Sequence, residues 1–113
     1  MLRTNLEHVE SEEQLRKLVE SNEKVAVCCG RMGPMCVPVY AIFETFQEKY
    51  PDIQFRDMDF DIPVASAIKG LSQCRNFFGL PFTIYYRNGQ IVKATSSIQS
   101  AKEVKNVIDD VFA

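Results

Sequence analysis

The chain carries apolar residues at two different spacings, one typical of amphipathic helices and the other typical of strands. Helical spacing occurs in four stretches, which cover about 11–21, 36–50, 63–77 and 100–112. Between them lie four strand-like runs, at 24–29, 53–61, 81–86 and 90–94. The first run is almost entirely apolar, which favours a strand buried on both faces of a sheet. The alternation of helices and strands predicts an α/β fold with a mixed central sheet and helices on both faces.

Local signals mark a hairpin and the starts of two helices. Asn88 and Gly89 stand between two strand-like runs, and this pair readily supplies the positive φ values of a type I′ turn. Ser11 and Ser100 each begin a stretch with the spacing of a capping box, which marks a helix N-terminus. In the stretch 63–77 the inward positions include Cys74, which we expect to pack as a small hydrophobic residue.

The composition is that of a globular protein. The sequence has 113 residues, 46% of them hydrophobic and 25% charged, which fits one domain over residues 1–113. The formal net charge of -2, without a long run of like charge, argues against nucleic acid as a partner. No apolar run approaches the roughly 18 to 20 residues that span a bilayer, and no secretory signal is recognisable. We therefore expect a cytoplasmic protein without a membrane partner.

The cysteines and the histidine limit the chemistry. Four cysteines, at positions 28, 29, 36 and 74, are too few and too irregularly spaced for a disulfide-rich secreted scaffold. We expect reduced thiols or a single redox pair. His8 is the only histidine, and its charged surroundings indicate a solvated side chain. A Cys/His catalytic pair is therefore not expected, and we predict neither a metal nor a cofactor.

Two motifs carry a resemblance to a known family. Gly33-Pro34 lies where the first strand meets a helix, and residues 79–83 read Gly-Leu-Pro-Phe-Thr just before the hairpin. With the order of the elements, these motifs resemble the thioredoxin family over roughly residues 8–113. The resemblance implies a three-layer sandwich of the thioredoxin type. It also implies a cis bond before Pro81, whose neighbouring backbone pairs with an incoming extended peptide.

The first motif departs from the family pattern. Residues 32–36 read Met-Gly-Pro-Met-Cys where the family has Cys-Gly-Pro-Cys, so Met32 takes the place of the exposed nucleophile. The second cysteine corresponds either to Met35 or, with one residue inserted, to Cys36, which the helix register favours. The chain also has no tryptophan, and its first strand lacks the buried acid that the family uses as a proton acceptor. A thioether can neither attack nor resolve a disulfide, which excludes a reductase cycle through residues 32 and 35. The stretch at roughly 62–78 is about five residues longer than in the family and would reshape one edge of the groove.

The missing nucleophile, tryptophans and acid favour a binding module. In this interpretation the groove holds an extended segment of a partner protein, and its residues are Met32, Gly33, Pro34, Met35, Leu80 and Pro81. Phe77 and Phe78 are candidate anchors beside the groove, and we expect at least one of them to pack in the core.

The alternative is an atypical thiol-disulfide oxidoreductase or a redox-responsive protein that acts on a protein thiol or disulfide client. Cys36 is the only cysteine at a helix N-terminus, a position that favours a thiolate. It could act alone, or with Cys29 if the loop between them brings the Cα atoms within about 7 Å. Because side chains alternate along a strand, only one of Cys28 and Cys29 can approach that loop. If Cys28 and Cys29 instead pack as small core residues, neither of them takes part in thiol chemistry.

A copper site is a third interpretation of the same residues. Two thioethers and one or two thiolates form a soft donor set that favours Cu(I), and they come from Met32, Met35, Cys36 and Cys29. Methionines beside a groove more often form an apolar contact surface for a partner, so we keep the prediction of no metal.

Overall fold

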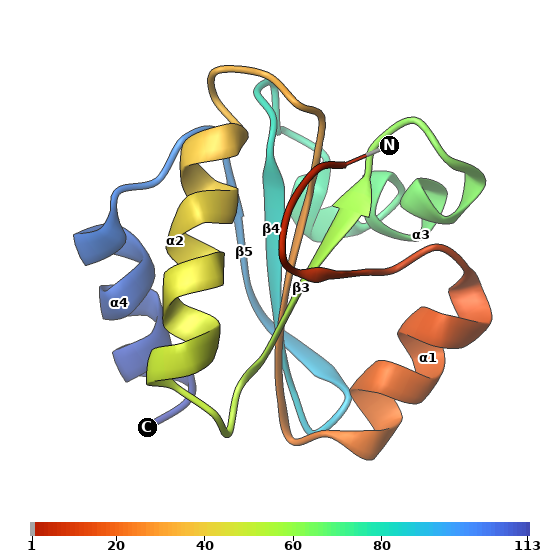
Figure 1. The fold of residues 1–113 in the computed structure, drawn as a ribbon. Coiled ribbons are helices and arrows are strands. Elements are labelled where there is room, and N and C mark those ends of the chain that lie inside the picture. The colour runs from red at the N-terminus through yellow and green to blue at the C-terminus, as the bar shows by residue number, and fades with distance from the viewer. Residues whose placement is uncertain (1) are drawn as a thin grey trace.

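The computed structural model describes residues 2–113 as a five-stranded sheet between two layers of helices (Figure 1). The strands, in chain order, are β1 (Glu7–His8), β2 (Lys24–Gly30), β3 (Gln54–Asp59), β4 (Phe82–Arg87) and β5 (Gln90–Ser96). Their order across the sheet is β1-β3-β2-β4-β5. β3 runs parallel to both of its neighbours, and β4 runs antiparallel to β2 and β5. This topology confirms the predicted mixed central sheet.

Helices cover both faces of the sheet, as predicted. They are α1 (Glu12–Ser21), α2 (Val37–Lys49), α3 (Ser66–Lys69) and α4 (Ala101–Val111). In Figure 1, α2 and α4 lie on one face of the sheet, and α1 and α3 lie on the other. None of the helices formed by residues 2–113 combines the length and the apolar character needed to cross a lipid bilayer.

The sheet divides the core into two halves because successive side chains of β2 point to opposite faces. Cys28 packs with Cys36 and Tyr40 in the half beneath α2 and α4. Cys29 packs in the other half, with Ile68 of α3 and residues of α1. Residues 25–29 are all 0% exposed, which confirms that β2 is buried on both faces.

The prediction of one continuous helix over 63–77 is wrong. The stretch contains a 3-10 turn (Pro63–Ala65), then the four residues of α3, then a second 3-10 turn (Ser72–Cys74). Gly70 ends α3, and Leu71 adopts an extended backbone that interrupts any helix. The expected burial of Cys74 is nevertheless confirmed, since its side chain is 4% exposed.

The turn and capping signals are confirmed to different degrees. Asn88 and Gly89 have φ values of 53° and 79°, as a type I′ turn requires. Ser100 forms both hydrogen bonds of its capping box. Ser11 accepts only the bond from the Gln14 N–H, because the Gln14 side chain bonds instead to the backbone of residues 8 and 10.

Strand β1 was not expected from the sequence. It has only two residues, which is too short for a periodic pattern to mark it. It pairs with β3, and the N–H of Val9 then donates to the carbonyl of Asp57 at 2.8 Å. The N-terminal segment is thereby fixed along the edge of the sheet, and Leu2 and Leu6 enter the core half beneath α2.

Candidate functional site

Three loops meet at the end of the sheet where β2 leads into α2, at the top of Figure 1. The N–H of Ser97, just after β5, donates to the carbonyls of Gly79 and Pro81 at 3.1 and 3.0 Å. The peptide bond between Leu80 and Pro81 is cis. A Cβ atom added to Gly30 would lie 3.1 Å from the Cβ of Pro81, so the end of β2 and this proline are in close contact. The structure thus brings residue 81 to the loop that contains residues 31–36.

Cys36 lies directly beneath this loop. It occupies the N-cap position of α2, and Pro38 follows in the first turn, where its missing N–H costs little. Its side chain is 2% exposed, and its Sγ accepts a hydrogen bond from the N–H of Arg31 at 3.4 Å. A Cβ atom on Gly30 would lie 2.7 Å from this sulfur, so only glycine fits here without a shift. The predicted candidate nucleophile is therefore at the expected helix start but covered by its own loop.

All four thiols are free and buried. Burial raises the pKa of Cys28 well above its usual range, that of Cys29 to about 12, and that of Cys74 to a smaller extent. Thiols with such pKa values are poor nucleophiles near neutral pH. Cys29, the candidate partner of Cys36, belongs to the opposite half of the core, and the alternation along β2 places Cys28 on the side of Cys36 instead.

The outer surface of the same loops carries several exposed apolar side chains. Met32 and Met35 are 43% and 42% exposed, Pro34 is exposed and Gly33 is half-buried. Phe78, three residues before Pro81, is 100% exposed. Its neighbour Phe77 behaves differently, because its ring packs edge-on against Phe82 with the centroids 5.2 Å apart. One of the two candidate anchors is therefore a packing residue and the other is free to meet a partner.

Within the described part of the chain, the backbone of Leu80 is unpaired. Within residues 2–113, neither its N–H nor its carbonyl takes part in a hydrogen bond. The residue is half-buried and lies two positions after the fully exposed Phe78. Unpaired N–H and carbonyl groups next to a strand can be satisfied by another extended chain.

The soft donors considered for copper lie in different surroundings. The sulfur of Met32 faces the N-terminal segment, where it accepts from the N–H of Arg3 at 3.4 Å. Cys36 is buried under the loop, and Cys29 faces the other half of the core. In the described part of the chain, no three His, Cys, Asp or Glu side chains are gathered as metal ligands.

A buried carboxylate was missed by the sequence analysis. Asp57 is 0% exposed in β3, directly opposite Cys28 of β2, and it accepts hydrogen bonds from Thr4 and pairs with His8. Burial raises the pKa of Asp57, and these two partners oppose the rise. His8 is therefore not the free, solvated residue we predicted. Asp57 lies two positions after the buried Phe55, and side chains two positions apart in a strand point to the same face. This spacing is the signal that could have indicated an inward carboxylate.

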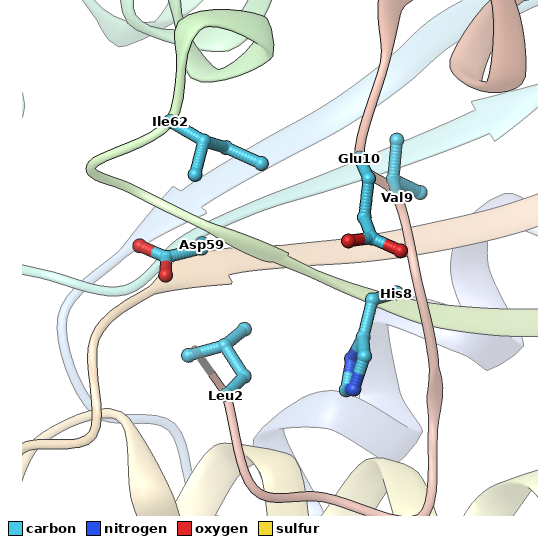
Figure 2. A pocket seen from close by; sticks show the side chains of 6 residues that line it. All are labelled: Leu2, His8, Val9, Glu10, Asp59 and Ile62. Carbon is cyan, nitrogen blue, oxygen red and sulfur yellow. The ribbon is translucent and has the colours of Figure 1, made fainter.

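A cavity of about 280 Å³ lies beside this pair (Figure 2). It is lined by three apolar and three polar side chains, which belong to Leu2, Val9, Ile62, His8, Glu10 and Asp59. A second cavity, of about 200 Å³, shares Leu2 and Asp59 with it and extends to Met32 and Arg31. The guanidinium of Arg31 is held there by the carboxylate of Asp61 at 2.8 Å. The hollow surface therefore runs from the N-terminal segment to the edge of the loop at residue 32.

No family model and no curated protein matches this chain, but solved structures resemble it closely in shape. A chain from a study of thiol resolution in the yeast mitochondrial 1-Cys peroxiredoxin by glutathione and thioredoxin systems has a TM-score of 0.78 at 15% identity, covering 95% of this chain and 96% of its own. Thioredoxin from Plasmodium falciparum has a TM-score of 0.76 at 20% identity, with 94% and 99% covered. Thioredoxin from Malassezia sympodialis has a TM-score of 0.77 at 14% identity, with 100% and 96% covered. The chain therefore has a thioredoxin-like fold, as its sequence motifs predicted.

Proposed function

We propose that this protein binds an extended segment of a partner protein at the surface beside Pro81. The observation that carries the proposal is the unpaired backbone of Leu80 next to the fully exposed ring of Phe78. An extended peptide could satisfy the N–H and the carbonyl of Leu80 and place an apolar side chain against Phe78. A large aromatic side chain at the surface is a common anchor of protein interfaces.

The methionines extend this surface across the neighbouring loop. Met32 and Met35 each expose about two fifths of their surface. Methionine is flexible and polarisable, so it adapts to different apolar side chains. Ile98, in the turn that bonds to residues 79 and 81, adds a third exposed apolar residue at 44%. We expect a partner segment with apolar side chains at alternate positions, which would all point to this face.

The alternative redox function has weaker support. The thioredoxin-like neighbours include thiol oxidoreductases, and Cys36 occupies a helix start. A disulfide client, however, must align its S–S bond with an attacking sulfur, and Cys36 is 2% exposed. The four reduced thiols suit a reducing compartment such as the cytosol, which stays our prediction for the location.

The test is a selection of peptides from a displayed random library on the purified protein. Selected peptides should lose at least about tenfold in affinity for Phe78→Ser, because an anchor residue commonly contributes more than 1.4 kcal/mol to binding. Methylating the backbone nitrogens of a selected peptide should weaken it as well, since this removes the donors that would face Leu80.

Val92→Ser is the matched control. Val92 is 41% exposed, about as much as Met35, but it lies within β5 rather than at the loops. If selected peptides bind the Phe78 and Val92 variants equally well, or lose nothing on backbone methylation, the proposed groove is wrong.

A further inference from the structure

A buried hydroxyl under the loop 31–36 has no hydrogen-bond partner among residues 2–113. Tyr40 is 1% exposed, and among the described residues its Oη makes no hydrogen bond. A buried hydroxyl without a partner costs free energy relative to an apolar group of the same shape. Burial raises the pKa of Tyr40 well above its usual range, so the hydroxyl keeps its proton and is able to donate. The Tyr40 hydroxyl can therefore donate to an acceptor that forms beside it, and its position relative to Cys36 decides whether one does.

The hydroxyl converges with the sulfur of Cys36. A Cβ atom on Gly30 would lie 2.9 Å from the Oη of Tyr40 and 2.7 Å from the Sγ of Cys36. Both groups therefore border one point at the end of β2. The sulfur already accepts one hydrogen bond, from the N–H of Arg31 at 3.4 Å. An oxygen atom attached to this sulfur would meet a second donor at Tyr40.

We propose that Cys36 is a site of oxidation by hydrogen peroxide, and that the Tyr40 hydroxyl donates a hydrogen bond to the oxygen of the sulfenic acid formed. The sulfur attacks one peroxide oxygen, so that an S–O bond forms and the O–O bond breaks. The displaced hydroxide takes the thiol proton and leaves as water. Cys36 is oxidised by two electrons and the peroxide is reduced by two. An added thiol reductant returns the sulfenic acid to the thiol.

The size of the oxidant and the exposure of each sulfur explain why peroxide would react and why it would react at Cys36. Peroxide is small enough to reach a sulfur that is 2% exposed, whereas a glutathione disulfide would need room for two peptides. The cover over Cys36 is thin, since residues 31–35 are exposed apart from the half-buried Gly33. Cys28 and Cys29 are 0% exposed within β2. Cys74, at 4%, is as accessible as Cys36, but within residues 2–113 no hydrogen bond reaches its sulfur.

The experiment treats the folded protein with hydrogen peroxide, removes the excess peroxide with catalase, and then unfolds the protein in a cyclic 1,3-dione, which alkylates sulfenic acids. Digestion and mass spectrometry then give the adduct yield at each cysteine. The dione leaves methionine sulfoxide unlabelled, so oxidation of the exposed Met32 and Met35 does not interfere. We expect an adduct at Cys36 in clear excess over Cys74, and little glutathione adduct when glutathione disulfide replaces peroxide.

Tyr40→Phe tests the role of the hydroxyl. Because that hydroxyl has no partner within residues 2–113, its removal should leave folding intact, which urea unfolding checks. The yield at Cys36 should fall by about fivefold, the factor that one neutral hydrogen bond supplies, while the yield at Cys74 stays unchanged. Tyr85→Phe is the matched control, since Tyr85 is another buried tyrosine with an unpartnered hydroxyl in the same half of the core.

Three results would overturn the proposal. An adduct at Cys36 that forms only when the protein is unfolded before the peroxide is added would show that the thiol is inert in the fold. Equal labelling of Cys36 and Cys74 would show that exposure alone decides. Equal yields of the Cys36 adduct from Tyr40→Phe and the wild type would show that Tyr40 has no role in the oxidation. None of these results depends on the proposed peptide groove, which is tested by the Phe78 variant without any oxidant.

Discussion

Adding a single methyl group to Gly30 tests the packing at the centre of the site. In Gly30→Ala the new Cβ would lie 2.7 Å from the sulfur of Cys36, 2.9 Å from the hydroxyl of Tyr40 and 3.1 Å from the Cβ of Pro81. Real Cβ atoms do not approach other heavy atoms to the first two distances, so at least one neighbour must move. The backbone conformation of Gly30 itself is open to alanine, because its φ lies outside the positive region.

The expected cost follows from two opposing effects. Overpacking a well-filled core destabilises a protein by about 1 to 3 kcal/mol. Replacing glycine with alanine in an allowed conformation returns about 0.4 to 1 kcal/mol by restricting the unfolded chain. We therefore expect Gly30→Ala to lower the free energy of unfolding by about 1 to 2 kcal/mol. With a urea slope of about 1 to 3 kcal/mol per molar, the midpoint should fall by about 1 M.

A double-mutant cycle locates the strain. Cys36→Ala removes the nearest contact atom and should cost about 1 kcal/mol on its own, as the loss of one buried heavy atom does. In the double variant the new methyl group at position 30 occupies space that the Cys36 sulfur has vacated. Its loss of unfolding free energy should therefore be smaller than the sum of the two single losses by about 1 kcal/mol. Equilibrium unfolding in urea measures all four proteins.

Gly33→Ala is the matched control for this cycle. Gly33 lies in the same loop, but a Cβ there would meet no atom within 4 Å. This variant should differ from the wild type by no more than about 0.5 kcal/mol. If Gly30→Ala is equally harmless, or if its effect and that of Cys36→Ala add within about 0.5 kcal/mol, the convergence of the sulfur and the hydroxyl on Gly30 is refuted.

Three further predictions use other parts of the chain. The pKa of Asp57 is raised in the fold, chiefly by burial, so the stability it contributes is fully present below its unfolded pKa and is lost as the pH rises through its folded pKa. The unfolding free energy of the wild type minus that of Asp57→Asn should therefore decrease between about pH 3 and pH 7 in urea unfolding; an increase would mean that the bonds from Thr4 and His8 outweigh burial. Ser100→Ala breaks a complete capping box and should lower the unfolding free energy by about 1 kcal/mol, seen as a lower thermal midpoint by circular dichroism, and an unchanged midpoint would contradict it. Phe78→Ser should change stability by less than about 0.5 kcal/mol, because its ring is fully exposed; a larger loss in urea would show that the ring packs.

Features governed by a few neighbouring residues could be predicted from the sequence. The turn at Asn88 and Gly89 and the cap at Ser100 depend on side chains and φ values within four residues of each other. The burial of Val25 and its neighbours follows from an uninterrupted apolar run. These local signals were sufficient to predict the layer order and the mixed sheet, since connections between successive elements are short and right-handed.

Features that depend on distant residues could not be read in the same way. The partners of Asp57 come from the N-terminal segment, about fifty positions earlier in the chain, and no local pattern links Thr4 or His8 to β3. The helix over 63–77 failed for a different reason. Its inward positions fit helical spacing, but Gly70 and the extended Leu71 let the chain turn while Ile68 still reaches the core.

The placement of the sulfur atoms separates the proposed binding surface from the proposed site of oxidation. A dithiol reductase needs an exposed thiolate on the loop and a proton acceptor behind its second thiol. Here the exposed sulfurs of the loop are thioethers, and the buried acid, Asp57, faces Cys28 and the N-terminal His8. Binding beside Pro81 needs only the outer apolar side chains, and oxidation of Cys36 needs only the groups beneath them. Phe78→Ser should therefore weaken peptide binding and leave the oxidation of Cys36 unchanged, whereas Tyr40→Phe should lower the yield of oxidised Cys36 and leave peptide binding unchanged.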